Sequence, residues 1–338
     1  MSDTILFCEM NEDWQIDNIK DALSDLDLSP RFTELPLHEV DDNTLREARY
    51  LSVFISSECN SDTLSRFPDL EFISTRSTGF DHVDLDYCRQ NNIEVSNVPT
   101  YGENTVAEHT FALILSLSRN LHEAMERTRR GEFNMEQLRG FDLRGKTIGV
   151  IGTGHIGIHV IRMARGFGMD VVAYDIEHNS FMAELLGFDY VDLDHLLESS
   201  DIISLHVPLN DHTRHMIDRE ELEQCRDEAL IINTARGALV NTDALLDCLE
   251  AGNLNGAGLD VLEGEEMLLS DIKLNEKEFS RDKLARLIQN DKLIKRDDVI
   301  FTPHMAYNSK EAIERILNTT VENIQSYLQG NPKNTVRD

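Results

Sequence analysis

The chain has 338 residues and a formal net charge of −30 at pH 7, from 62 acidic and 32 basic residues. A chain of this length is too long to fold around one hydrophobic core, which predicts two domains. The negative charge disfavours nucleic acids and anionic membrane surfaces as partners. No apolar run approaches the roughly 18 residues of a membrane span, and the N-terminal residues lack the basic and apolar regions of a signal peptide.

The cysteines and lysines bear on the cellular compartment. The five cysteines are Cys8, Cys59, Cys88, Cys225 and Cys248. Because their number is odd and no CxxC pair occurs, we expect reduced thiols in a cytoplasmic protein, not disulfides or a zinc site. Only nine basic residues are lysine, which together with the acidic excess leaves two interpretations open: a salt-rich cytosol, or an ordinary acidic surface.

Apolar runs alternate with amphipathic runs along the chain. The predicted strands of the first hundred residues are 5–8, 51–57, 70–77 and 93–98. A long amphipathic helix is predicted over 104–132. The later predicted strands are 147–152, 170–175, 201–207, 229–235, 256–261 and 299–303. Those from 147 to 256 begin 23 to 31 residues apart, which fits a strand and a crossover helix, and therefore predicts a doubly wound parallel sheet.

The turn after the strand at 147–152 carries a G-x-G-x-x-G motif, formed by Gly152, Gly154 and Gly157. The first glycine permits a tight turn, the second lets the backbone approach a pyrophosphate, and the third lets the helix pack on the strand. Asp175 lies 18 residues past the third glycine, where a carboxylate holds a ribose 2′-hydroxyl. No arginine for a 2′-phosphate follows it within 176–179, so we expect NAD and not NADP as the cofactor.

The motif begins late in the chain, which suggests that one domain is split in sequence. We expect a discontinuous substrate domain of residues 1–100 and 306–338, and an inserted dinucleotide-binding domain of residues 101–305. A last predicted helix over 309–330 would return the chain to the first domain. Ligand sites are common between domains, so the active site is expected in the cleft between these two.

Two polar side chains follow later strands of the predicted sheet. Arg236 lies in a glycine-containing turn after the strand at 229–235, where its guanidinium could hold a carboxylate through a bidentate fork. His304 follows a proline after the strand at 299–303 and could act as an acid–base group. The alternatives are a surface arginine that caps a helix and a structural histidine.

An acidic segment lies between these two positions. Asp260 ends a predicted strand and is followed by Glu263, Glu265 and Glu266. One interpretation is that these acidic residues are simply part of a solvated loop without a function in a site. Together with the histidine and the arginine, however, an orienting carboxylate at the same edge of the sheet makes a coherent site. No spacing of ligands predicts a metal.

At these motifs the chain resembles the D-isomer-specific 2-hydroxyacid dehydrogenases, and within them the D-lactate dehydrogenase branch. The motifs are, in chain order, TRSTGFDHVDLDYC, VPTYGENTVAEHTFALIL, GTGHIG, SLHVPL, NTARG, GLDVLEGEE and TPHMAY. They cover nearly the whole chain, and the long segment 267–298 is similar to that of the D-lactate enzymes. The resemblance implies an α/β fold of two doubly wound parallel-sheet domains, with a Rossmann NAD-binding domain inserted in a flavodoxin-like substrate domain.

The resemblance also implies roles for single residues. Arg236 would bind the substrate carboxylate, His304 would donate and accept the proton, and Glu265 would be the carboxylate partner of His304. Chemistry alone does not distinguish Glu265 from Glu263 and Glu266. The implied cofactor contacts are Gly152, Gly154, His155, Ile156, Gly157, Asp175, Val207, Pro208, Thr213, Thr234, Ala235, Arg236 and Asp260. The implied substrate contacts are Ser77, Thr78, Gly79, Tyr101, Arg236 and Tyr307.

The reaction implied is the NAD-dependent reduction of a small 2-oxo acid to the D-2-hydroxy acid, foremost pyruvate to D-lactate, and the reverse. One alternative is another enzyme of the family, acting on glyoxylate, hydroxypyruvate or a branched oxo acid. Another is a non-catalytic dinucleotide sensor, because corepressors share the fold. The helix at 104–130 carries much apolar surface and its match in the family lies at a two-fold interface, so we expect a homodimer.

Overall fold

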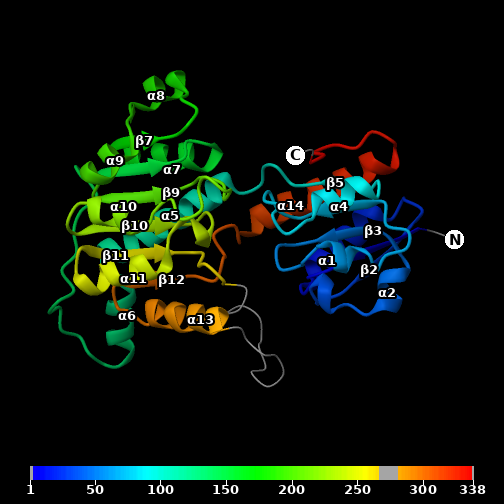
Figure 1. Cartoon of the computed structure of the whole chain (residues 1–338), viewed down its shortest axis with the longest axis horizontal. Helices are drawn as coiled ribbons and strands as arrows, with labels where there is room; N and C mark the ends of the chain where they lie inside the picture. The colour runs from blue at the N-terminus through cyan, green and yellow to red at the C-terminus, as the bar shows by residue number, and fades with distance from the viewer. Residues whose placement is uncertain (1–2, 266–280, 337–338) are drawn as a thin grey trace. The chain divides into compact units, whose positions relative to one another are not determined.

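The computed structural model describes residues 3–265 and 281–336. The chain divides into two compact units: unit 1 is Met1–Tyr101 with Ser309–Asp338, and unit 2 is Gly102–Asn308 (Figure 1). The expected crossings between domains lay at residues 100 and 305. Glu266 and the first part of the segment 267–298, up to residue 280, lie outside the described residues.

Unit 1 is built on a five-stranded parallel sheet. Its strands are β1 (Asp3–Phe7), β2 (Leu28–Phe32), β3 (Ala48–Val53), β4 (Phe72–Thr75) and β5 (Glu94–Ser96). Their order in the sheet is β2-β1-β3-β4-β5, the flavodoxin-like order. The helices are α1 (Asp13–Leu23), η1 (Leu37–Glu39), α2 (Asp42–Arg46), α3 (Ser61–Leu64), α4 (Leu85–Gln90) and α14 (Lys310–Leu328).

The C-terminal helix α14 completes the core of unit 1. Leu317 and Ile324 of α14 are buried in the same cluster as Phe7 and Phe72 of the sheet. The ring of Tyr327 stacks on that of Phe72, with 4.3 Å between the ring centroids. The C-terminal helix α14 therefore stabilises the sheet that the N-terminal part of the chain forms.

Unit 2 is built on a seven-stranded parallel sheet. Its strands are β6 (Thr147–Ile151), β7 (Asp170–Tyr174), β8 (Asp189–Tyr190), β9 (Ile202–Leu205), β10 (Ala229–Asn233), β11 (Leu254–Leu259) and β12 (Val299–Phe301). Their order is β12-β11-β10-β9-β6-β7-β8. The order reverses between β6 and β9, and ligands of such sheets bind at the carboxyl ends of the strands beside this reversal.

Helices cover both faces of the sheet of unit 2. They are α5 (Glu103–Ser118), α6 (Leu121–Arg129), α7 (His155–Gly166), α8 (Ser180–Leu186), α9 (Leu193–Ser199), α10 (Arg219–Gln224), η2 (Gly237–Leu239), α11 (Thr242–Ala251) and α13 (Arg281–Ile294). One core cluster draws on α5 and α7, and the other draws on α9, α10 and α11. All five residues of β10 are buried, as expected for a strand covered on both faces.

The helix expected over 104–132 is two helices, α5 and α6. Asn120 separates them, with a φ of 49° in the left-handed region, which asparagine adopts more readily than most residues. The chain also returns across the end of α5, where the backbone N–H of Phe141 donates to the carbonyl of Ser118 at 2.9 Å. Apolar periodicity alone does not reveal such a break.

Candidate active site and dinucleotide site

The three glycines after β6 form a tight turn that enters α7. Gly152 has a φ of 96°, and a Cβ there would lie 2.7 Å from the carbonyl group of His206. A Cβ on Gly157 would overlap the carbonyl oxygen of Gly152, whereas a Cβ on Gly154 would meet nothing within 4 Å. The first and third glycines thus permit close packing, and the second faces open space at the helix start.

This turn fits a pyrophosphate. The first turn of the 12-residue helix α7 contains no acidic residue, so its N–H groups and positive dipole end attract an anion. His155 and Ile156 lie in that first turn. The open space at Gly154 is where a phosphate could approach the backbone.

Asp175 follows β7 next to this turn. Its Oδ2 accepts hydrogen bonds from the N–H of Thr153 at 2.6 Å and from the Thr153 hydroxyl at 3.0 Å, and its Oδ1 accepts from the N–H of Glu177 at 3.0 Å. Burial by itself would raise the pKa of Asp175, but these hydrogen bonds outweigh it and hold the pKa below its ordinary value. The side chain is therefore a carboxylate that can accept a ribose hydroxyl.

The other expected cofactor contacts of unit 2 follow β9 and β10. Val207 and Pro208 lie two and three residues after the end of β9, and the hydroxyl of Thr213 donates to the carbonyl of Pro208 at 2.6 Å to close that turn. Thr234 is buried, with its hydroxyl 3.0 Å from that of Thr110 in α5. The N–H of Ala235 donates to Asn233 at 3.0 Å. These residues lie at the carboxyl ends of neighbouring strands.

His304 and Glu265 are in direct contact through their side chains. Nδ1 of His304 lies 2.6 Å from Oε1 of Glu265, and the two side chains are 22% and 15% exposed. The other oxygen of Glu265 accepts from the N–H of Leu262 at 2.8 Å. A carboxylate can only accept a hydrogen bond, so the proton in this contact lies on Nδ1. Nε2 is then the nitrogen that is left to exchange a proton with a ligand.

Asp260 holds the turn that carries His304. Its side chain is buried, and its two oxygens accept from the N–H groups of Met305 at 3.0 Å and Ala306 at 2.8 Å. The hydroxyl of Thr302 also donates to it. The backbone N–H of His304 donates to the Asp260 carbonyl at 2.8 Å. Contact of this carboxylate with the cofactor stays a prediction, and its observed partners are the backbone around His304.

Arg236 lies in a turn shaped by Asn233, the last residue of β10. The amide of Asn233 donates to the carbonyl of Arg236 at 2.9 Å and accepts from the N–H of Ala235 at 3.0 Å. A Cβ on Gly237 would overlap the backbone of Leu262 and Glu263. The arginine turn therefore packs directly on the loop that carries Glu265.

Of the described glutamates after Asp260, Glu265 contacts His304 and Glu263 does not. Oε1 of Glu263 lies 3.1 Å from Nε2 of His215 and 3.6 Å from Arg214, and its Oε2 lies 3.1 Å from Arg286 of α13. The partners of Glu263 are thus His215, Arg214 and Arg286, and not His304.

Comparison with known proteins decides the family. Residues 111–306 match the family described as D-isomer specific 2-hydroxyacid dehydrogenase, NAD binding domain. The chain belongs to this family. It is an NAD-dependent dehydrogenase of D-2-hydroxyacids, with NAD as its cofactor.

Individual relatives span most of the chain. A D-lactate dehydrogenase of Escherichia coli (strain K12) is 35% identical over 304 residues, which cover 88% of this chain and 89% of the relative. An aromatic 2-oxoacid reductase of Clostridium sporogenes is 37% identical over 288 residues, 84% of each. A D-lactate dehydrogenase of Aquifex aeolicus, solved with NAD and lactic acid, has a TM-score of 0.87 and 38% identity over 97% of this chain and 96% of its own. These names favour a dehydrogenase over a non-catalytic sensor.

Several residues of this dehydrogenase's site were missed by the sequence analysis. They are Asn233, which shapes the arginine turn, His109, which lies 2.9 Å from Thr302 and 3.4 Å from Asp260, and His215 beside Glu263. Asn233 could have been found from its place at a strand end, directly before the residues that turn. The two histidines have no such signal, because their partners are distant in sequence.

His206, another histidine of unit 2, differs from His304. His206 follows β9, and Nε2 of its ring lies 2.8 Å from the hydroxyl of Ser204. Burial lowers the pKa of His206 to about 3, so its ring is neutral at physiological pH. It cannot serve as the imidazolium that a reductase needs.

The expected substrate contacts belong to both units. In unit 1, the hydroxyl of Ser77 donates to the carbonyl of Gly79 at 2.6 Å, and that of Thr78 donates to the carbonyl of Val98 at 2.8 Å. The carbonyl of Tyr101 accepts from Arg315. In unit 2, the turns that carry Arg236, Asp260, Glu265 and His304 lie in contact with one another. Tyr307 lies three residues after His304.

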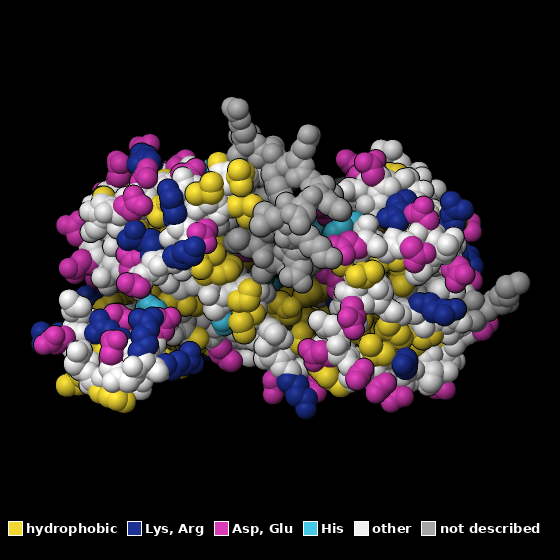
Figure 2. All heavy atoms as spheres, turned by 90° about the horizontal axis from the view of Figure 1, so that it is seen from below, with side chains coloured by type: hydrophobic (Ala, Val, Ile, Leu, Met, Phe, Trp, Pro, Cys, Tyr) yellow, Lys and Arg dark blue, Asp and Glu magenta, His cyan; other side chains and the backbone are white. Residues whose placement is uncertain are grey.

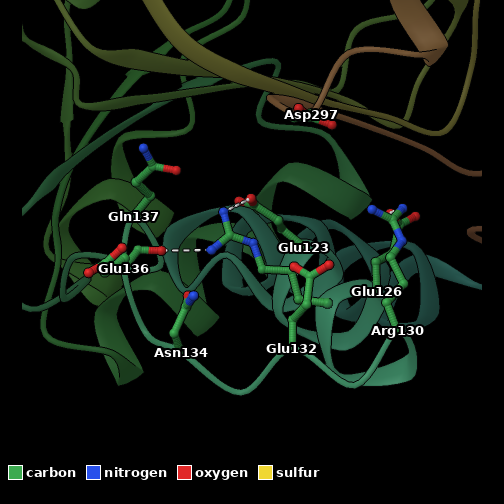
Figure 3. A pocket seen from close by; sticks show the side chains of 9 residues that line it. Glu123, Glu126, Arg130, Glu132, Asn134, Glu136, Gln137 and Asp297 are labelled. Carbon is green, nitrogen blue, oxygen red and sulfur yellow. Dashed lines mark hydrogen bonds and ion pairs between the residues drawn. The ribbon is translucent and has the colours of Figure 1, made fainter.

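The hollow drawn in Figure 3 lies elsewhere in unit 2, on α6 and the loop after it. It has a volume of about 410 Å³ and is lined by Glu123, Glu126, Arg127, Arg130, Glu132, Asn134, Glu136, Gln137 and Asp297. Arg127 donates to the carbonyl of Glu136 at 2.7 Å and to the carboxylate of Glu123. The lining has five acidic and two basic side chains, a negative balance that disfavours an anionic ligand such as a 2-oxo acid.

Within residues 3–265 and 281–336, no helix is long and apolar enough to cross a membrane. In the same ranges, no group of three or more histidine, cysteine, aspartate or glutamate side chains is arranged to hold a metal ion.

Proposed function

We propose that this dehydrogenase reduces pyruvate to D-lactate with NADH and catalyses the reverse reaction. The observation that carries the proposal is the 2.6 Å contact between His304 and Glu265, on loops that pack against the turn of Arg236. A proton donor, its orienting carboxylate and a guanidinium for the substrate carboxylate are the groups that reduction of a 2-oxo acid needs.

His304 performs the proton transfer in this proposal. Bound NADH supplies the hydride that C2 of the oxo acid accepts. Nε2 of His304, as an imidazolium, donates a proton to the oxygen on C2, and in the oxidation direction it accepts that proton back. Glu265 holds Nδ1–H throughout, so that Nε2 stays directed toward the substrate and the imidazolium is stabilised.

Arg236 positions the substrate and stabilises charge. Its fork can hold the carboxylate through two parallel hydrogen bonds, and its charge favours electron density moving onto the C2 oxygen. The proposal assigns the holding of NAD to Asp175 and the Gly152–Gly157 turn. It assigns further substrate contacts to the backbone of residues 77–79, to Tyr101 and to Tyr307, with unit 1 as the substrate domain.

The choice of pyruvate is supported by relatives named D-lactate dehydrogenase. A relative of similar identity is named an aromatic 2-oxoacid reductase, so the size of the group on C2 is the point to test. An apolar pocket discriminates weakly, since one methylene is worth about 1–3 kcal/mol. We therefore expect measurable activity on 2-oxobutyrate as well.

A substrate panel with NADH tests the proposal. We would measure kcat/KM for pyruvate, 2-oxobutyrate, glyoxylate, hydroxypyruvate, a branched 2-oxo acid and phenylpyruvate, and analyse the product of pyruvate on a chiral column. We expect the largest kcat/KM for pyruvate, and D-lactate as its product. A kcat/KM for another oxo acid that exceeds that of pyruvate tenfold would reject this substrate, and L-lactate as the product would reject the proposed D-stereochemistry.

We also propose that the enzyme is a cytoplasmic homodimer. The cysteines are free thiols and four of the five are buried, which suits a reducing compartment. Apolar side chains on α6 and the loop after it are exposed, namely Leu121, Met125, Phe133 and Met135. Such a group of exposed apolar side chains favours an isologous contact between two copies. Light scattering at micromolar concentration tests this, and a monomeric mass would contradict it.

A further inference from the structure

A chain of hydrogen bonds in unit 2 ends at the carboxylate of Asp175. The hydroxyl of Thr153 donates to Oδ2 of Asp175 at 3.0 Å. The hydroxyl of Tyr190, at the end of β8, lies 2.8 Å from that of Thr153. The backbone N–H of Asn179 donates to the Tyr190 hydroxyl at 3.1 Å.

Chemistry fixes the direction of every bond in this chain. The N–H of Asn179 can only donate, and the ionised carboxylate of Asp175 can only accept. Because the hydroxyl of Thr153 donates its hydrogen bond to Asp175, the oxygen of Thr153 accepts one from the hydroxyl of Tyr190. The oxygen of Tyr190 in turn accepts a hydrogen bond from the N–H of Asn179. All donors therefore point the same way, and hydrogen bonds in such a series strengthen one another.

Tyr190 also fixes the turn that follows Asp175. The ring of His178 stacks on the Tyr190 ring, with 4.2 Å between centroids and 5° between planes. The side chain of Asn179 caps α8 by accepting from the N–H of Met182 at 3.1 Å. The turn 176–179 is thus held to β8 by one stacked ring and one hydrogen bond, both on Tyr190.

We propose that Tyr190 is a positioning residue for cofactor choice: through Thr153 it holds the Asp175 carboxylate in the orientation that accepts the ribose hydroxyls of NAD and repels the 2′-phosphate of NADP. The inference rests on the role proposed above for Asp175. Tyr190 acts through Asp175 and does not itself contact the cofactor in this account.

The expected effect is selective for NADH. Removal of the Tyr190 hydroxyl leaves the Thr153 hydroxyl without its donor and the turn 176–179 without its hydrogen bond to β8, so the carboxylate samples more orientations. Loss of one such hydrogen bond corresponds to a change of about three- to tenfold in Kd. NADPH gains nothing from a fixed Asp175, so its binding should not weaken.

The test compares Tyr190→Phe with Tyr174→Phe. Tyr174 ends β7, directly before Asp175, and its hydroxyl makes no hydrogen bond within the part of the chain that the structure describes. We would measure Kd for NADH and NADPH by fluorescence, kcat at saturating NADH, and the thermal midpoint. For Tyr190→Phe we expect a three- to tenfold rise in Kd for NADH, with kcat and Kd for NADPH within twofold of wild type. We expect no change for Tyr174→Phe.

A double-mutant cycle separates this role from general stability. Thr153→Val interrupts the same chain and should have the same effect, Thr153→Ser should behave as wild type, and Tyr190→Phe should add less than twofold in the Thr153→Val background. Equal weakening of NADH and NADPH, additive effects, or an unchanged Kd for NADH in Tyr190→Phe would each overturn the proposal.

Asp175→Asn distinguishes the role of Tyr190 from that of Asp175. If it lowers the preference for NADH while Tyr190→Phe does not, the role of Tyr190 is wrong and that of Asp175 stands. If Asp175→Asn leaves the preference unchanged, the proposed role of Asp175 itself is wrong.

Discussion

Nδ1 of His304 lies 2.6 Å from Oε1 of Glu265, although 38 residues separate the two in the chain. The contact joins the loop after β11 to the loop after β12, and these strands are neighbours in the parallel sheet. The fold therefore brings both groups to one edge, and the hydrogen bond decides which nitrogen of the ring remains for proton exchange.

Replacement of His304 tests the proton donor. His304→Ala should lower kcat for pyruvate reduction by about 10²- to 10⁴-fold, the usual contribution of a general acid. NADH binding, measured by fluorescence titration, should stay within about threefold of wild type, because the side chain is assigned to the substrate. Turnover near the wild-type rate would mean that His304 is a structural residue.

Replacement of Glu265 tests the orienting carboxylate. Glu265→Gln replaces the carboxylate that contacts Nδ1 of His304 with a neutral amide. A hydrogen bond to a charged group contributes about 1.5–3 kcal/mol, so kcat/KM for pyruvate reduction should fall by about 10- to 100-fold. The matched control is Glu263→Gln, since Glu263 contacts His215 and not His304; its kcat/KM should stay near the wild-type value. If Glu265→Gln keeps the wild-type kcat/KM, another group orients His304.

Arg236→Lys tests the substrate fork. Lysine keeps the charge but cannot form two parallel hydrogen bonds with a carboxylate, so KM for the oxo acid should rise at least tenfold. Kd for NADH should change little by comparison. An increase of Kd for NADH that equals the increase of KM would indicate that Arg236 serves the cofactor or the fold instead.

Asp260→Ala tests the turn that carries His304. The variant leaves the buried N–H of Ala306 and the partly buried donors of Thr302 and Met305 without their acceptor, and an unpaired buried group costs about 1–3 kcal/mol. We expect the free energy of unfolding to fall by about 2–4 kcal/mol in urea titrations, with reduced kcat. Unchanged stability would show that these donors find other partners.

The sequence predicts the alternation of strands and helices because strands buried on both faces read as continuous apolar runs. It does not predict β2, since Pro30 interrupts that run; a proline is tolerated there because β2 is an edge strand. It does not predict β8, which has only two residues. The break at Asn120 depends on a single left-handed residue, which a period of 3.6 does not reveal.

The site is predictable where a residue's role follows from its place at a strand end, as for Gly152, Arg236 and His304. It is not predictable where a role depends on a contact between loops. The chemistry of the residues leaves three glutamates as partners for His304. The family resemblance implies Glu265, and the structure shows that Glu265 contacts His304 whereas Glu263 contacts His215. The bonds of Tyr190 likewise connect residues whose spacing carries no pattern.

The surface charge predicts how stability depends on salt. Acidic side chains are widespread on the face of each unit seen in Figure 2, and the chain carries 62 acidic against 32 basic residues. Ion pairs at the surface, such as Arg49 with Asp3 and Glu71, contribute little to stability because water and salt screen them. Salt weakens these pairs, but it also screens the repulsion among the unpaired acids, whose excess is 30.

Because repulsion outnumbers attraction, screening should favour the compact state. We expect the thermal midpoint to rise between 0.05 M and 1 M NaCl. The comparison variant carries Glu34→Lys, Glu132→Lys and Glu198→Lys, at three exposed positions. It should have a higher midpoint at low salt and a smaller gain with added salt. A thermal midpoint that stays level or falls with NaCl would show that the ion pairs outweigh the repulsion. The stability of the protein would then not require salt.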